Sequence, residues 1–240
     1  MSINVYWASL NDNWLFAKDP DLVLKNYIQR YKHIDFDDSS QMLMCPAVKD
    51  HTNNLFALRS LQSYEFFIDE NNSDSLYPVR SNMLDQSFFD DRVQLRNLES
   101  KMFSFKANTY LFFTDEASLP VTYPIYPYLE DNNVSERIMP ITGTYDIGKW
   151  FRPLDFAFML KEKFNSFKID KDEVFAYIKF HTNKKINFKQ FIITPELTNF
   201  TRDCTVLTKY APLRSLENYY KTFRTKKLIL KEIEKNLMET

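Results

Sequence analysis

Short apolar segments alternate with polar boundaries through most of the chain, and this pattern predicts β-structure. Aromatic and β-branched residues fill the segments, and Asn, Asp, Ser or Pro bound them, as is typical of strands. Their length and spacing predict a β-rich α+β fold, either a distorted antiparallel sandwich or a jelly-roll-like sheet. The expected strands are residues 3–7, 64–68, 102–105, 110–113, 121–125, 154–160, 167–169 and 174–180.

A helical period of apolar positions occurs in only two places. Residues 20–31 follow Asp19, a favourable N-cap, and place Pro20 at the first helical position. Residues 213–238 lack Gly and Pro and predict one basic amphipathic helix whose lysines lie in solvent. Its expected apolar stripe comprises Leu216, Tyr219, Phe223, Leu230, Ile233 and Leu237.

The two patterns divide the chain into a β-rich domain, residues 1–208, and a C-terminal amphipathic helix, residues 209–240. An isolated helix of this length is marginal in water, so its apolar stripe must cover a surface. That surface is either the protein's own sheet or a second subunit, and the sequence leaves both open. The helix is therefore the expected place for a protein partner or for self-association.

Composition and charge narrow the class of protein. Of 240 residues, 44% are hydrophobic and 26% charged, which is typical of a globular chain. The 31 basic and 32 acidic residues balance, so no clear nucleic-acid signal arises. No apolar run approaches the ~20 residues of a membrane span, and we expect a cytoplasmic protein. We expect Cys45 and Cys204 to be buried free thiols of a reducing compartment, although a bridge between them stays open.

The only two glycines of the chain, Gly143 and Gly148, lie five residues apart, and we expect positive φ at one of them. The segment that follows holds a cation, an indole, a guanidinium and a carboxylate, a set that can bind an anionic or aromatic ligand. The alternative is structural: the guanidinium and the carboxylate pair at a tight corner while the indole fills the core. The candidate ligand-binding residues are Lys149, Trp150, Arg152 and Asp155.

Metal and catalytic motifs are weak. His33 and Asp35 form a His-x-Asp pair that, with the distant His181, has the composition of a non-haem iron triad. The basic residue that 2-oxoglutarate oxygenases place about ten positions after the last histidine is missing, because Phe191 stands there. The chain also lacks a nucleophile elbow, a Walker loop and a Cys-x-x-Cys pair. We therefore expect no cofactor and favour a non-enzymatic role, with an Fe²⁺-dependent oxygenase as the alternative.

Residues 140–158, together with residues 45–47 and 110–116, resemble an uncharacterised family of tailed-phage and marine viral proteins. The resemblance extends to about Phe191 and excludes the C-terminal helix. It implies a bacteriophage origin, which fits a chain rich in Asn, Lys, Ile and Phe and poor in Gly. It implies no activity and transfers no catalytic residue. We therefore expect a binding or structural β-domain of a viral protein, acting in the infected cell or in the virion.

Overall fold

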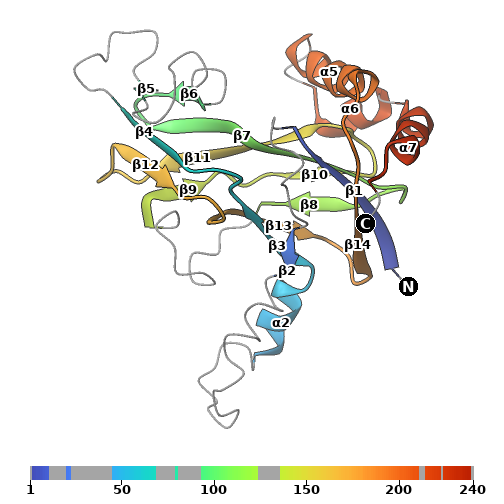
Figure 1. Cartoon of the computed structure of the whole chain (residues 1–240), viewed down its shortest axis with the longest axis horizontal. Helices are drawn as coiled ribbons and strands as arrows, with labels where there is room; N and C mark the ends of the chain where they lie inside the picture. Colours follow the sequence, from blue (N-terminus) through green and yellow to red (C-terminus); the bar gives the residue numbers. More distant parts are fainter. Residues whose placement is uncertain are drawn as a thin grey trace.

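The computed structural model describes residues 2–10, 20–22, 45–68, 79–80, 93–123, 136–210, 214–222 and 224–238. Three β-sheets fill the molecule, and three helices near the C-terminus gather at one end of it (Figure 1). The predicted β-rich α+β class is confirmed, with several antiparallel sheets and one mixed sheet. No described helix is both long enough and apolar enough to cross a membrane.

The largest sheet has six strands. Its path runs β14 (Lys185–Gln190), β1 (Ser2–Ser9), β7 (Met102–Phe113), β11 (Pro153–Leu160) and β9 (Ile138–Pro140), and β6 (Val93–Asn97) also pairs with β7. The β1–β14 pairing is parallel, and the other pairings in this sheet are antiparallel. The predicted segments 102–105 and 110–113 are the two ends of the single long strand β7.

Two smaller sheets complete the β-structure. The five-stranded sheet runs β10 (Thr144–Asp146), β8 (Pro120–Thr122), β13 (Val174–Phe180), β3 (Leu55–Arg59) and β2 (Asp21–Leu22). The three-stranded sheet runs β12 (Ser166–Ile169), β4 (Tyr64–Ile68) and β5 (Val79–Arg80). Because β2 is a strand, the helix predicted over residues 20–31 is wrong at its start, and residues 23–31 lie outside the described part.

Strands β1 and β7 are buried on both faces, because successive side chains point to opposite sides of a strand. Val5, Trp7 and Phe112 face the main core, which the three sheets share. Tyr6 and Phe113 face a second core on the other side. The second core comprises Tyr6, Ala8, Leu111, Phe113, Trp150, Phe151, Phe191, Leu197, Cys204, Tyr219, Ile229 and Ile233. This burial on both faces explains why the large sheet needs a helical layer.

Aromatic rings fill most of the main core. The Phe66 ring lies 5.3 Å from that of Phe103, and the Phe158 ring lies 5.0 Å from that of Phe167. In β11 every second residue is buried, as the alternating sequence pattern predicts. The rings therefore join strands of the large sheet to the small sheet that packs on it.

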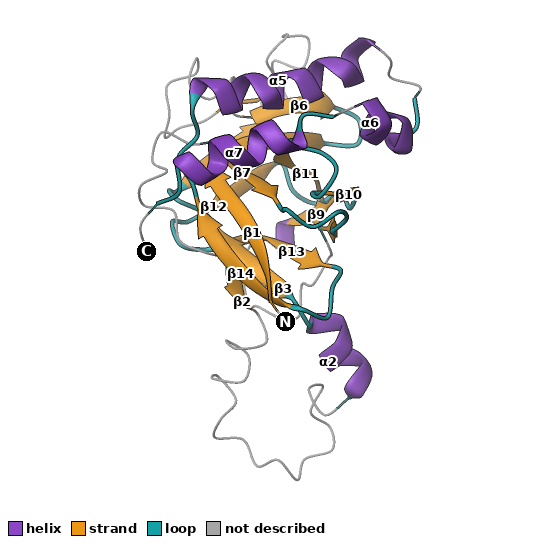
Figure 2. Ribbon diagram, turned by 90° about the vertical axis from the view of Figure 1, so that its right-hand side faces the viewer, coloured by secondary structure: helices purple, strands orange, loops and turns teal. Residues whose placement is uncertain are grey.

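The helical layer covers the second core (Figure 2). It consists of α5 (Pro195–Tyr210), α6 (Leu216–Thr222) and α7 (Lys226–Lys235), while the short helix α2 (Pro46–Thr52) lies at the opposite end of the molecule. The prediction that helix occurs in only two places is wrong, since neither α2 nor α5 was expected. The predicted single helix over residues 213–238 is also wrong, because α6 ends before α7 begins.

The predicted apolar stripe is only partly buried. Tyr219 and Ile233 belong to the second core, and Leu230 packs against it. Leu216 is 39% exposed, and Phe223 lies outside the described residues. Ile229, which the seven-residue pattern omitted, is fully buried. The break between α6 and α7 changes the phase of the helix, so a single stripe cannot describe both halves.

Candidate functional site

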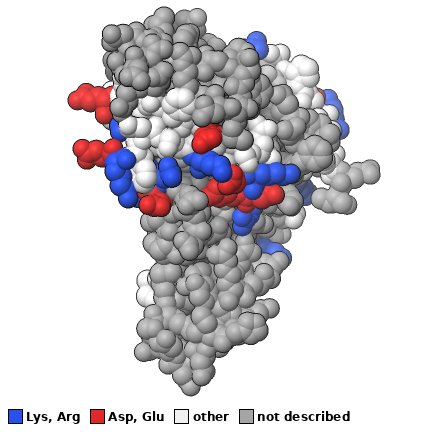
Figure 3. All heavy atoms as spheres, turned by 60° about the vertical axis from the view of Figure 1, so that its left-hand side comes forward, with Lys and Arg blue, Asp and Glu red and all other residues white. Residues whose placement is uncertain are grey.

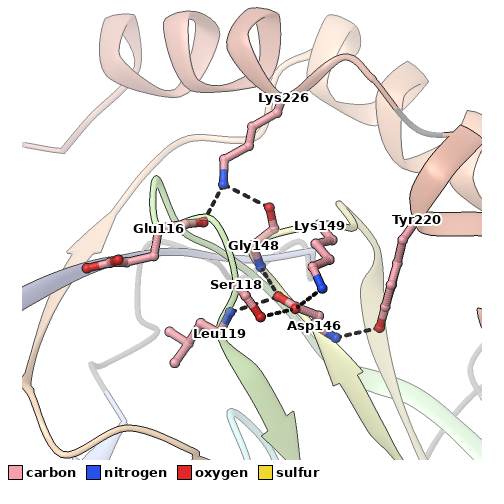
Figure 4. A network of polar contacts seen from close by, with 8 residues as sticks. All are labelled: Glu116, Ser118, Leu119, Asp146, Gly148, Lys149, Tyr220 and Lys226. Atoms are coloured by element: carbon pink, nitrogen blue, oxygen red, sulfur yellow. Dashed lines mark hydrogen bonds and ion pairs between the residues drawn. The ribbon is translucent and has the colours of Figure 1, made fainter. Parts of the chain in front are cut away.

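A buried carboxylate organises the turn that contains the second glycine. Asp146 ends β10, and its side chain accepts hydrogen bonds from the backbone N–H groups of Leu119 at 2.8 Å and Gly148 at 2.9 Å. The Ser118 hydroxyl also donates to it, and the Lys149 ammonium lies 3.2 Å away (Figure 4). Burial pushes the pKa of Asp146 upward, but these donors outweigh burial and hold the pKa below its ordinary value.

The positive φ expected at one of the two glycines is wrong, since neither has it. Gly148 is required for a different reason. A Cβ atom built at this position would lie 2.7 Å from the backbone oxygen of Glu116 and 3.0 Å from the Cα and N of Ser118. At Gly143 such an atom would meet nothing within 4 Å. The glycine at 148 therefore permits a close approach of two chain segments.

Helices α6 and α7 are fixed to the same turn by polar contacts (Figure 4). The Tyr220 hydroxyl accepts a hydrogen bond from the backbone N–H of Asp146 at 2.7 Å. The Lys226 ammonium donates to the backbone oxygens of Glu116 and, at 2.8 Å, Gly148. The lysines of this helix were predicted to lie in solvent. For Lys226 that prediction is wrong, because its ammonium group turns inward to these two oxygens. Burial lowers its pKa, and nearby carboxylates offset part of that shift.

A cavity of about 330 Å³ lies beside this turn. Residues 141–145 and 152–155 form most of its wall, and Tyr123, Trp150 and Leu216 complete it. We call it the β10–β11 pocket, because its two wall segments run into β10 and β11. The helical layer contributes Leu216, the first residue of α6, to this wall.

Three of the four predicted ligand-binding residues line the pocket: Trp150, Arg152 and Asp155. Gly143 also lines it. The fourth, Lys149, is not among the lining residues and pairs with Asp146 instead. Trp150 is only 2% exposed, so the alternative interpretation of this residue as a core side chain also holds.

The alternative interpretation had Arg152 and Asp155 pair with one another at a tight corner. No ion pair between described residues joins them. The register between β11 and β7 shifts here, because Leu154 pairs with Tyr110 and Phe156 pairs with Phe105. The extra residues lie on β7, and β11 keeps its regular alternation. Leu154 and Asp155 both line the cavity.

Two tyrosines that sequence reasoning missed, Tyr123 and Tyr145, also line the pocket. The hydroxyl of Tyr145 is buried and has no hydrogen-bond partner among the described residues. Burial raises the pKa of Tyr145 well above 10.0, and the nearby Arg152 charge opposes this rise. Burial likewise raises the pKa of Tyr123, and Tyr145 and Asp155 add to that rise. Both phenols therefore stay protonated at neutral pH.

The residues proposed for iron are only partly described. His33 and Asp35 lie outside the described residues. The His181 Nε2 atom lies 3.0 Å from the Thr122 hydroxyl, and burial followed by the Lys179 charge lowers the pKa of His181. Within the described ranges, no group of three His, Cys, Asp or Glu side chains could hold a metal ion.

Charges of both signs are interleaved on the face shown in Figure 3. Near β9 and β12, Lys163 lies 3.6 Å from Glu136, and Lys168 lies 3.2 Å from Asp170. A surface that binds a nucleic-acid backbone concentrates positive charge instead. The described part of this face therefore presents mixed charge and no basic stripe.

Comparisons with known proteins add no relatives from which to judge this site. No protein-family model matches the chain, and the searches of curated proteins and of solved structures return no match.

Proposed function

We propose that this protein is a non-enzymatic binding protein that takes a small organic ligand into the β10–β11 pocket. The observation that carries the proposal is the cavity wall, which holds the Arg152 guanidinium and the Asp155 carboxylate beside apolar surfaces, with no ion pair between described residues joining the two charges. The Tyr145 hydroxyl is buried away from this surface. The cavity, at about 330 Å³, falls within the usual range for small-molecule sites.

The chemistry of the wall favours binding over catalysis. The described lining contains no His, Cys or Lys, which are common proton carriers and nucleophiles. Its one carboxylate, Asp155, has no second carboxylate beside it in the wall. The two tyrosines have raised pKa values and so stay neutral at physiological pH. Such a wall holds and orients a ligand.

The viral origin implied by the resemblance of residues 140–158 forms a second part of the proposal. We propose that the protein acts either in an infected bacterium or in the virion. Mass spectrometry of purified particles separates the two: its peptides in washed virions support a virion component, whereas their confinement to the cell lysate supports an intracellular role.

The pocket can be blocked from its edge. Leu216 lines the cavity and is 39% exposed, so Leu216→Trp enlarges a side chain at the boundary without filling the core. Leu228→Trp is the matched control, because Leu228 is 58% exposed on α7 and is absent from the lining. Small aromatic acids, amines, amino acids and neutral ring compounds are screened by thermal shift.

Isothermal titration calorimetry gives a second readout, because the added tryptophans would confuse one based on indole emission. We expect some probes to raise the melting temperature and to give a heat of binding in wild type and Leu228→Trp, and to do neither in Leu216→Trp. Binding that persists equally in Leu216→Trp would place the ligand elsewhere. A full screen without any binding would refute the proposed function.

A further inference from the structure

We infer that the ligand of the β10–β11 pocket is a small zwitterion with an apolar body, of the α-amino acid class. This inference rests on the proposed function and specifies the chemistry of its ligand. Two features carry it: one cationic and one anionic side chain in the same wall, and apolar surfaces around the remainder.

The two charges are the first feature. Arg152 and Asp155 both line the cavity, and no ion pair between described residues joins them. A simple anion placed against Arg152 would also face Asp155, and a simple amine would face Arg152. A molecule that carries both charges satisfies both side chains. The wall thus discriminates against singly charged ligands by repulsion as well as by lost attraction.

The two charges also assign the two ends of the ligand. The Arg152 guanidinium is a fork of N–H donors that suits the two oxygens of a carboxylate. The Asp155 carboxylate, which lines the same wall, then accepts the ammonium group of the ligand.

The apolar surfaces receive the side chain of the ligand. Trp150 and Leu154 are nearly buried, and Leu216 closes the wall from α6. An indole and two leucine side chains suit an aromatic ring or a branched aliphatic chain. About 330 Å³ is enough for a large apolar amino acid but small for a longer peptide.

The test uses two series of probes that differ only in charge. The aromatic series is phenylalanine, 3-phenylpropionate and 2-phenylethylamine, and the aliphatic series is leucine, 4-methylpentanoate and 3-methylbutylamine. Binding to the full chain is measured by isothermal titration calorimetry. In at least one series we expect the amino acid to bind about tenfold to a hundredfold more tightly than either singly charged analogue, because each analogue loses one charge-assisted contact.

Two variants connect each charge to its partner. Arg152→Gln should remove the preference for the amino acid over the amine, and Asp155→Asn should remove the preference over the acid. Arg202→Gln and Asp203→Asn, at exposed positions on α5, are the matched controls and should change neither. Loss of the same preference in a control would mean that net charge, not the pocket, causes the discrimination.

The outcomes separate the inference from the proposed function. Equal binding of all three members of each series, blocked by Leu216→Trp, would overturn the zwitterion and retain the pocket as a binding site. Binding of a singly charged analogue more tightly than the amino acid would overturn it as well. If neither these probes nor the wider screen binds, the proposed function itself fails.

Discussion

A single methyl group has no room at position 148, and Gly148→Ala tests whether the turn around Asp146 is as tightly closed as the structure indicates. The added Cβ would lie 2.7 Å from the Glu116 carbonyl oxygen and 3.0 Å from two Ser118 backbone atoms. All three are main-chain atoms, which cannot swing aside as a flexible side chain can. One of the two segments must therefore move.

The cost of that movement follows from overpacking, which is worth about 1–3 kcal/mol for a methyl group in a well-packed site. The same shift strains the hydrogen bond from the Gly148 N–H to Asp146, which is 2.9 Å long, and the contact of Lys226 with the Gly148 oxygen. In a chain of this size, about 1–3 kcal/mol corresponds to a fall in melting temperature of roughly 2–12 °C.

Gly143→Ala is the matched control. Its Cβ would meet nothing within 4 Å, and no glycine has positive φ. The variant should be as stable as wild type or gain about 0.4–1 kcal/mol, because alanine restricts the unfolded chain. Urea unfolding followed by far-ultraviolet circular dichroism measures both variants. Equal stability of Gly148→Ala and wild type, or equal losses in the two variants, would refute the reasoning.

Three further predictions concern single side chains. Lys226→Met should lower the free energy of unfolding in urea by about 1–3 kcal/mol, because two backbone oxygens lose their donor. The control Lys227→Met, at an exposed position, should leave that free energy unchanged. Folding lowers the pKa of Asp146 below its ordinary value of 3.8. The ionised Asp146 carboxylate therefore stabilises the fold above pH 3.8, and this stability is lost as the pH falls through the pKa of the folded protein. The stability difference between wild type and Asp146→Asn should therefore shrink below about pH 4, and a difference independent of pH would contradict this. Iodoacetamide should modify the exposed Cys45 in the native protein and reach Cys204 only in urea, because burial raises the pKa of Cys204 to about 12. Mass spectrometry counts the adducts on each molecule. Two adducts on the native protein would contradict this prediction.

The strands with alternating apolar residues were predictable from the sequence, because their period matches a sheet with one buried face. Strand β11 is an example. Strand β13 was predictable for another reason, because its apolar residues form a nearly continuous run that is buried on both faces. Strand β14 was missed, since its sequence KINFKQ carries lysines suited to a sheet edge and few apolar residues. The pairing of β14 with β1 is parallel and joins distant segments, and no local pattern encodes it.

Helix α5 was missed although its start carries a recognisable signal. The Thr194 hydroxyl accepts a hydrogen bond from the Leu197 N–H at 3.1 Å, and Pro195 follows the capping residue. The weak apolar period of α5 hid this signal.

Free thiols were predicted and are confirmed, but Cys45 is exposed and not buried as expected.

The site was predictable only where its residues are adjacent in the sequence. Arg152 and Asp155 were found from their local combination of charges, but nothing near Tyr123 indicates that it lines the same pocket as Tyr145. The inward turn of Lys226 was also hidden, because a lysine in a basic helix is usually solvated. Such long-range contacts depend on the packing of the helical layer and not on any local motif.

Strand β1 is synthesised long before strand β14, although the two lie side by side in the large sheet. The Asn4 side chain bonds to Asn187, 183 positions later, and the second core is complete only when Ile229 and Ile233 are present. At about 5–20 residues per second, strand β1 waits roughly ten to forty seconds for its parallel neighbour. During synthesis β1 can pair with β7 but not yet with β14, so we expect the nascent chain to expose apolar surface until residues 185–233 have been made.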